Sequence, residues 1–374
     1  MELWDVYDIH RRKMGYKLAR CTPDELPEGC DWRPALAPSG KLDLRPEEYH
    51  LSAHIWFVNS KGELLIQKRA ENKRHMPGVW AACGGAALAG EDSVTTAVRE
   101  SYEEMGIIVD PSRLIRILTY TAPERHSHMD VYIYRYECNP DDLTLQKEEV
   151  SRAGWFSLED VTGKRFTDEQ FRRYTYLDIL YEFVHFNAAW QRRGFIDPGA
   201  PRKFTEMVDI YDIRGNATGR VMQRGSAQPY GEYYRTAQVW FIGSDGRVLL
   251  QRRAMGCAFK PGYYGITGGI VESGESEQDA ARREVAEELG LKLDERNMFR
   301  LCSYVGRYSL CTVYVVNQDI AADEMHLQKD EVASVEFISA DMLSAYSSAP
   351  NFLRPPYLPM VTSVMRVLEK ARHA

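Results

Sequence analysis

The stretch that decides the fold is GIVESGESEQDAARREVAEELGL, residues 269–291. The chain holds a second version of it, GAALAGEDSVTTAVRESYEEMGI, at residues 85–107. Both have the same order of fixed positions: a glycine, a glutamate, an Arg-Glu pair, a Glu-Glu pair and a final glycine, with five, seven, two and one residues between them. Identical spacing at two places indicates one functional element that is present twice.

The acidic residues of each stretch lie at positions i, i+3 and i+4, which share one face of a helix. Like charges so close together repel, and a cation removes the repulsion. Carboxylate oxygens suit Mg²⁺ or Mn²⁺ better than zinc, and a carbonyl of the preceding glycine pair could complete the shell. A solvated acidic helix face is the alternative. The candidate metal ligands are Gly84, Glu100, Glu103, Glu104, Gly268, Glu284, Glu287 and Glu288.

An arginine comes directly before each cluster, at Arg99 and Arg283. A guanidinium there can pair with one of the carboxylates and fix its orientation. We therefore include both arginines among the candidate catalytic residues.

The repeat extends well beyond these stretches. Residues 50–107 align without a gap on residues 234–291, with 21 identities in 58 positions. The motif LQK-x-EV recurs at 145–150 and 327–332, and the first copy carries an extra segment of about 20 residues within 20–48, which we predict to be a loop. Each copy is too long for a solenoid unit. We predict one domain at 1–195, a turn-rich linker at 196–203 and a second domain at 204–374.

The local pattern is similar in both copies. Residues 54–58 and 64–69 are β-rich and flank a turn, which predicts a hairpin, and residues 131–136 and 311–316 are typical of strands. The acidic stretches predict helices at 93–105 and 276–289, with Ser93 and Ser276 as N-caps and a glycine after each C-terminus. Residues 171–190 and 359–371 are expected to form closing helices.

Composition excludes several classes of protein. The net charge of -7 from 47 basic and 54 acidic residues gives no reason to expect general nucleic-acid binding. No run approaches the roughly 18 apolar residues of a membrane span, and the first residues do not resemble a signal peptide. Seven cysteines without a C-x-x-C pair favour a reducing cytoplasm. The oligomeric state stays open.

Residues 85–107 and 269–291 resemble the Nudix box, the signature of the Nudix hydrolase family. The second copy matches at every position, whereas the first has Ser101 where an aliphatic residue is expected (Val285 in the second copy). The N-terminal halves also resemble the Nudix branch related to isopentenyl diphosphate isomerase. The resemblance implies an α+β fold class: two tandem Nudix folds, each an α/β/α sandwich with a mixed sheet.

The resemblance also implies a reaction, the hydrolysis of a nucleoside diphosphate linked to another moiety by attack of water on phosphorus. The box glutamates would hold one to three divalent ions, Mg²⁺ or Mn²⁺, whereas Glu91 and Glu275 would be structural. The general base in this family is a box glutamate or one on a later loop, where Glu149 and Glu331 are candidates. A surface acid is the alternative for both.

Four basic residues at strand ends are candidates for binding phosphate, although exposed strand-end residues are an alternative. They are Lys68, Arg69, Arg252 and Arg253. The expected partner is a small nucleotide or diphosphate substrate.

Two other functions stay open. An isomerase-like activity in the first domain would need a cysteine and histidines near the metal, and Cys83, His50 and His54 are candidates that the second copy lacks. Alternatively, one domain is catalytic and the other binds a nucleotide as a regulator. In that case, Ser101 makes the first domain the better candidate for the non-catalytic role.

Overall fold

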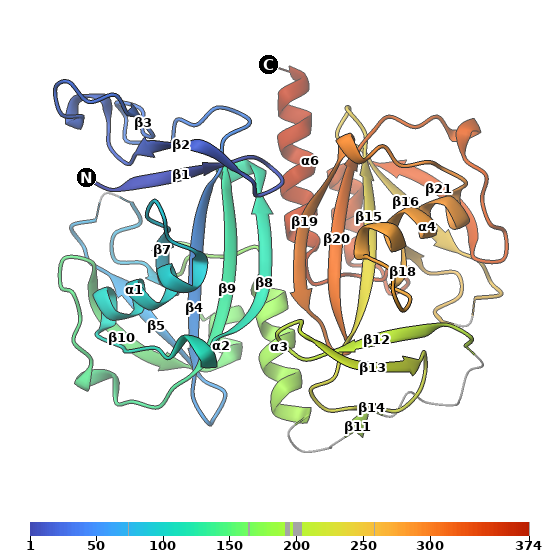
Figure 1. Cartoon of the computed structure of the whole chain (residues 1–374), viewed down its shortest axis with the longest axis horizontal. Coiled ribbons are helices and arrows are strands. Elements are labelled where there is room, and N and C mark those ends of the chain that lie inside the picture. Colours follow the sequence, from blue (N-terminus) through green and yellow to red (C-terminus); the bar gives the residue numbers. More distant parts are fainter. Residues whose placement is uncertain (74, 164, 191–194, 197–203, 258, 374) are drawn as a thin grey trace. The chain divides into compact units, whose positions relative to one another are not determined.

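The structure, a computed structural model, describes the whole chain except residues 74, 164, 191–194, 197–203, 258 and 374. The chain forms two compact units, Met1–His185 and Phe186–Ala374 (Figure 1). All but the first residue of the predicted linker at 196–203 lies outside the described residues. The predicted domain boundaries therefore stay a prediction, and each unit is described by itself.

The first unit is built on a mixed sheet with the strand order β10-β5-β4-β9-β8. β4 and β9 run parallel and the other neighbours run antiparallel, while two short strands, β6 and β7, pair with β5 and β4. The strands are β4 (His50–Val58), β5 (Leu64–Arg69), β6 (Trp80–Ala81), β7 (Cys83–Ala86), β8 (Ile115–Ala122), β9 (Ser127–Arg135) and β10 (Val150–Phe156).

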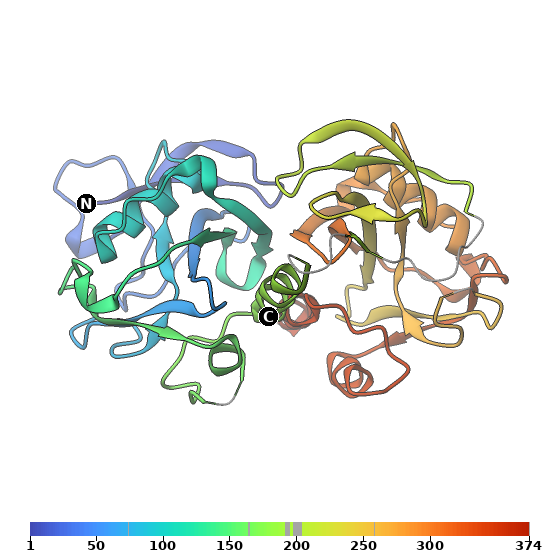
Figure 2. The same ribbon diagram turned by 90° about the horizontal axis from the view of Figure 1, so that it is seen from below.

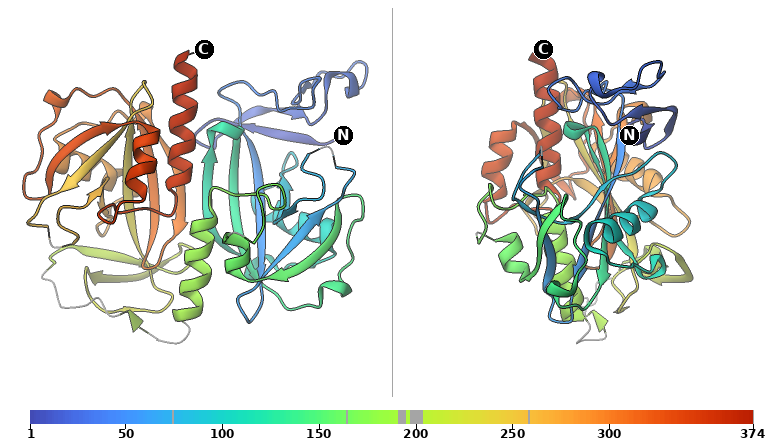
Figure 3. Two further views of the ribbon diagram at one scale, coloured as in Figure 1. Left: turned by 180° about the vertical axis from the view of Figure 1, so that it is seen from behind. Right: turned by 90° about the vertical axis from the view of Figure 1, so that its left-hand side faces the viewer.

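Helices cover both faces of this sheet, as Figure 3 shows. They are α1 (Ser93–Met105), α2 (Leu158–Thr162) and α3 (Leu177–Trp190). Alternate residues of a strand point to opposite faces. Ile55 of β4 therefore joins the core beneath α1 with Ala97, whereas Trp56 packs edge-on against Tyr174 on the other face. The α/β/α sandwich with a mixed sheet is thus confirmed.

The second unit repeats this plan with the strand order β19-β20-β15-β16-β21, in which only β15 and β20 are parallel. Figure 2 shows α4 on one side of its strands and α5 on the other. The strands are β15 (Tyr234–Ile242), β16 (Val248–Arg253), β17 (Tyr264–Gly265), β18 (Thr267–Ile270), β19 (Met298–Val305), β20 (Ser309–Asn317) and β21 (Val332–Ile338). The helices are α4 (Glu277–Leu289), α5 (Ala340–Ser347) and α6 (Leu358–His373).

An N-terminal hairpin precedes each main sheet. These hairpins are β1 (Leu3–Tyr7) with β2 (Lys13–Ala19) and β12 (Met207–Tyr211) with β13 (Ala217–Gln223), and a small pairing joins β11 (Phe195–Ile196) to β14 (Gln228–Pro229). The extra segment of the first copy is mostly loop, as predicted. It adds only a short strand, β3 (Arg33–Pro34), and one turn of 3₁₀ helix, Pro23–Glu25.

Two predicted elements differ from the structure. The expected hairpin of β4 and β5 pairs only at Phe57–Leu65 and Val58–Leu64, because β7 pairs with β4 further along. The first closing helix begins at Leu177 and not at residue 171, since Phe171 bridges to Trp80. The second closing helix agrees with its predicted position to within two residues at each end.

The N-cap of the first box helix was also predicted wrongly. Asp92 caps α1 by accepting a hydrogen bond from the backbone N–H of Thr95, whereas Ser276 caps α4 as predicted. An aspartate is as good a cap as a serine, so Ser93 becomes the first residue of the helix and not its cap. Ser93 is then free to donate to the buried carboxylate of Asp130, at 2.5 Å from Oγ to Oδ2. Both helices end at a left-handed glycine, as predicted.

Removing the Ser93 hydroxyl should therefore destabilise the first unit for a reason other than capping. We expect Ser93→Ala to lower the free energy of unfolding in urea by about 1–3 kcal/mol, because the buried Asp130 loses a donor. Asp92→Ala, the true cap variant, should cost about 1 kcal/mol. If the loss from Ser93→Ala were as large in an Asp130→Asn background as in the wild type, this assignment would be wrong.

Candidate functional site

The two glycines of β7 bring the backbone against the box helix. Gly84 has a φ of 138°, and a Cβ atom there would overlap the carbonyl oxygen of Ala53 on β4. A Cβ on Gly85 would instead overlap the carboxylate of Glu100. The second unit repeats both restrictions at Gly268 and Gly269. The loop and the helix are therefore held at a distance that only glycine permits.

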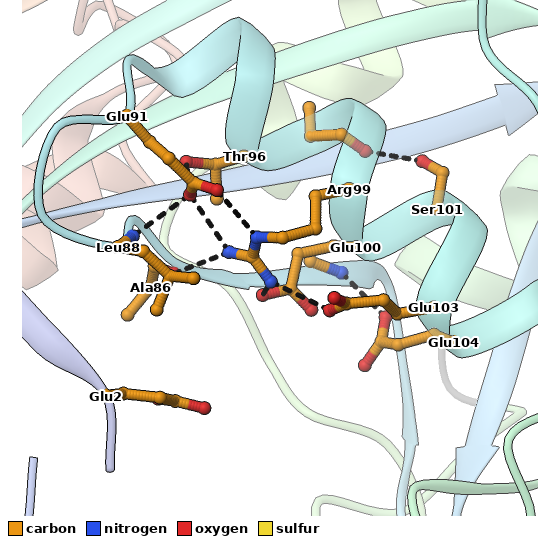
Figure 4. Close-up of polar contacts among 12 residues, drawn as sticks. Glu2, Ala86, Leu88, Glu91, Thr96, Arg99, Glu100, Ser101, Glu103 and Glu104 are labelled. Atoms are coloured by element: carbon orange, nitrogen blue, oxygen red, sulfur yellow. Dashed lines mark hydrogen bonds and ion pairs between the residues drawn. The ribbon is translucent and has the colours of Figure 1, made fainter.

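Arg99 is the centre of the acidic cluster in the first unit (Figure 4). Its guanidinium bonds to Glu91 at 2.8 Å, to Glu100 at 2.9 Å and to Glu103 at 2.9 Å. A further bond of 3.1 Å goes to the carbonyl oxygen of Ala86. The sequence predicted a pair with one carboxylate, and the structure shows three. Glu91 thus orients the arginine that in turn orients the other two acids.

The second unit reproduces this arrangement around Arg283. The guanidinium lies 3.0 Å from Glu275, 2.8 Å from Glu284 and 3.3 Å from Glu287. It also donates to the carbonyl of Ile270 at 3.0 Å. The equivalent contacts in two copies that differ at most positions indicate that the arrangement is set by the spacing of the box.

The last glutamate of each cluster forms no ion pair among the described residues. Glu104 is 5% exposed and accepts hydrogen bonds from the Gln67 amide at 2.8 Å and the Gly84 N–H at 3.0 Å. Glu288 is 3% exposed and accepts from the Gln251 amide at 3.1 Å. Sequence reasoning missed both glutamines, although their identity at the same position of the two copies was a signal.

Burial raises the pKa of several of these glutamates. Desolvation, and then the neighbouring charge of Glu104, raises the pKa of Glu100 to about 7 against the opposing effect of Arg99. Desolvation raises the pKa of Glu288 to about 8, and it also raises the pKa of Glu104 and Glu284. Such shifts mark carboxylates whose charge is poorly compensated by the protein alone.

The late glutamates lie on loops that the backbone ties to the box helices. The N–H of Gln146 donates to the carbonyl of Glu104 at 3.1 Å, and the N–H of Gln328 donates to that of Glu288 at 3.0 Å. The charge of Glu331 contributes to the raised pKa of Glu288. The structure therefore brings Glu149 and Glu331 to the same end of the site, while their role as general base stays a prediction.

All four candidate phosphate-binding residues contact the loop after their own strand. Arg69 donates to the His75 carbonyl at 3.2 Å, Arg253 to that of Phe259 at 2.9 Å and Arg252 to that of Gly262 at 3.3 Å. Lys68 is paired with Glu71 at 3.2 Å. These contacts show that the residues shape the loop, and their binding of phosphate stays a prediction.

The candidate isomerase residues do not converge. Cys83 is buried in the core beneath α1, whereas His54 points to the opposite face of the sheet and bonds to the Tyr176 hydroxyl at 2.6 Å. His50 stacks on Trp4 with ring centroids 4.6 Å apart. Within the described part of the chain, no three His, Cys, Asp or Glu side chains already form a metal-binding group.

Comparison with known proteins agrees with this geometry. The NUDIX domain model matches residues 48–179 and 232–358, more than half of the chain. The chain belongs to the Nudix family. It is a Nudix hydrolase with two tandem domains, domain 1 and domain 2, and its acidic helices are Nudix boxes.

Each of the following relatives matches about a third of the chain. An uncharacterized Nudix hydrolase of Listeria monocytogenes is 37% identical over 149 residues, which are 38% of this chain and 86% of the relative. The isopentenyl-diphosphate Delta-isomerase of Streptomyces coelicolor is 31% identical over 134 residues, which are 33% of this chain and 64% of the relative. The crystal structure of a C. elegans Ap4A hydrolase binary complex is 21% identical with a TM-score of 0.28 and covers 37% of this chain and 98% of that one.

Nudix hydrolases generally use divalent metal ions and act on small nucleotide or diphosphate substrates. The helices in the described residues include none long and apolar enough to cross a membrane.

The paired glycines give a matched test of the site. Gly84→Ala should destabilise domain 1 by about 2–4 kcal/mol, because both φ and the Ala53 carbonyl oppose a side chain. Gly85→Ala should cost less stability, because the flexible Glu100 side chain can move aside, yet it should weaken Mn²⁺ binding about tenfold. Urea unfolding and Mn²⁺ titration by electron paramagnetic resonance measure the two effects. Equal destabilisation by both variants would show that the two glycines do not have these separate roles.

The raised pKa of Glu288 predicts an unusual dependence of stability on pH without metal. Between its ordinary pKa of 4.5 and the folded value of about 8, the folded state keeps a proton that the unfolded state has lost. The free energy of unfolding in EDTA should therefore fall as pH rises through this range, by up to about 1.4 kcal/mol per unit from this group. Calorimetry of wild type and Glu288→Gln checks this, since the variant should lose less stability.

Proposed function

We propose that each Nudix domain hydrolyses a diphosphate bond in a nucleoside diphosphate-linked substrate, with Mg²⁺ or Mn²⁺ as the cofactor. The observation that carries the proposal is the acidic cluster itself, in which three glutamates bond to one arginine and a fourth, the most buried, has only neutral donors beside it among the described residues. Both copies retain every charged member of the cluster. We therefore favour two active domains over one catalytic and one regulatory domain.

The residues of the cluster fit a hard divalent ion. Four carboxylates against one guanidinium leave an excess of three negative charges when all are ionised, and the carboxylate of Glu104 is buried. Oxygen donors of this kind are the ligands that Mg²⁺ and Mn²⁺ prefer. The residues that would hold the ions are Glu100, Glu103, Glu104 and the Gly84 carbonyl in domain 1, and Glu284, Glu287, Glu288 and the Gly268 carbonyl in domain 2.

The bound ion would neutralise the diphosphate and lower the pKa of a bound water. The protein's own residues do the rest. Arg99 keeps Glu100 and Glu103 on the face of α1 that meets the glycine loop, and Gln67 fixes the carboxylate of Glu104. A box glutamate or the late glutamate accepts the proton of the attacking water. The water oxygen then forms the new bond to phosphorus, and the bridging P–O bond breaks.

The seven cysteines support the cytoplasm as the compartment of this reaction. All of them are free thiols, which suits a reducing environment. Lys68, Arg69, Arg252 and Arg253 stay candidates for contacts to the phosphates, since charged donors at strand ends suit that role.

A double substitution tests the proposed function. Glu104→Gln with Glu288→Gln keeps the hydrogen bonds to Gln67 and Gln251 possible but removes one negative charge from each site. We expect hydrolysis to fall at least about 10³-fold, a scale typical for loss of a central catalytic group. The assay uses the full chain with Mg²⁺ or Mn²⁺ and a panel of ADP-ribose, dinucleoside polyphosphates, NADH, CoA, nucleoside triphosphates and prenyl diphosphates. Undiminished hydrolysis by the folded double variant would refute the proposal.

A further inference from the structure

One of the differences between the two sites lies beside their late glutamates. Lys73, on the loop between β5 and β6, aligns with Cys257 on the loop between β16 and β17. The Lys73 ammonium lies 2.5 Å from the Glu149 carboxylate, and the two side chains are 24% and 34% exposed. The late glutamate of domain 1 is therefore held in a partly buried ion pair.

The backbone around the two late glutamates is the same. The N–H of Ala70 donates to the Glu149 carbonyl and the N–H of Ala254 to the Glu331 carbonyl, both at 2.8 Å. On the other side, each loop bonds to the last turn of its box helix through Gln146 or Gln328. The different surroundings of the two carboxylates therefore come from side chains and not from the course of the chain.

Domain 2 has no equivalent of the lysine ion pair among its described residues. The thiol of Cys257 contacts the backbone carbonyl of Glu331 at 3.3 Å. In the part of the chain that the structure describes, no lysine, arginine or histidine lies within ion-pair distance of the Glu331 carboxylate. Exchange of lysine for cysteine thus removes a cation from the end of the site where the late glutamate lies.

We propose that Lys73 is a positioning residue that holds Glu149 in an ion pair and slows hydrolysis by domain 1, whereas Cys257 leaves Glu331 available, so that domain 2 is the faster site. This inference rests on the proposed function. In domain 2, Glu331 accepts one proton from the attacking water, whose oxygen bonds to phosphorus. The bridging P–O bond breaks, and its electron pair leaves with the released phosphate. In domain 1, the Lys73 ammonium competes with that proton for the same carboxylate oxygen.

The test exchanges the two residues in the full chain, with one domain silenced at a time. In a Glu288→Gln background, which leaves domain 1 as the working site, Lys73→Cys should raise kcat about tenfold or more with KM unchanged. In a Glu104→Gln background, Cys257→Lys should lower kcat of domain 2 by a similar factor. The probe is the compound of the panel that the wild-type chain hydrolyses fastest.

Controls separate a positioning role from a general effect of charge or folding. Lys61→Cys removes an exposed lysine from the β4–β5 turn and should leave both constants unchanged. Lys73→Arg keeps a cation and should stay as slow as the parent. Calorimetry of each variant excludes unfolding as the cause of a change.

The outcomes distinguish this inference from the proposed function. If Lys73→Cys lowers kcat or raises KM, the lysine binds substrate and the inference is wrong. If both exchanges leave kcat unchanged, it is also wrong, although the proposed function stands as long as the Glu104→Gln, Glu288→Gln double variant is inactive. If that double variant stays fully active, the proposed function itself has failed.

Discussion

The organisation of each domain depends on a shortage of positive charge around the box helix. Arg99 and Arg283 each bond to three carboxylates, and this compensates for only part of the negative charge. The remaining acid is buried against the sheet, and the hydrogen bonds that it accepts from described residues come from neutral groups such as the Gln67 and Gln251 amides. Such an arrangement stabilises the folded chain poorly unless a cation completes it. The fold thus tolerates a local loss of stability, which is typical of a functional site.

The sequence predicted best those features that are set by neighbours along the chain. The box helices, their glycine ends and the shared face of the glutamates follow from helical periodicity, and all are found in the structure. The error at Ser93 is also local, because two adjacent residues could each cap the helix. What separated them was Asp130, 37 residues away, which offers Ser93 a better partner.

Contacts between distant segments could not be predicted in the same way. The bond from Gln67 to Glu104 joins a strand to a helix 37 residues later, and nothing in either segment specifies the other. Comparison of the two copies was the one source of such information within the sequence, since Gln67 and Gln251 are identical. The arrangement of the isomerase candidates could not be predicted for the same reason. Cys83 lies just before the box and His54 lies on the strand β4. Because side chains alternate along β4 and β7 pairs with it, the two side chains lie on opposite faces of the sheet.

The duplication also shows which parts of a domain can diverge. Ser101 replaces Val285 on the buried side of the box helix, and α1 and α4 still span equivalent residues. The Ser101 hydroxyl donates to the Ala97 carbonyl at 2.6 Å and so leaves no unsatisfied donor. The box itself cannot vary so freely, since three of its glutamates share one guanidinium. In the described residues of the loops after β5 and β16, no single side chain holds several others in this way. The ends of these loops are fixed by backbone hydrogen bonds and by Arg69 or Arg253. Their side chains can therefore change the electrostatics of a site whose metal-binding core stays the same, and this is where two copies of one enzyme can acquire different rates.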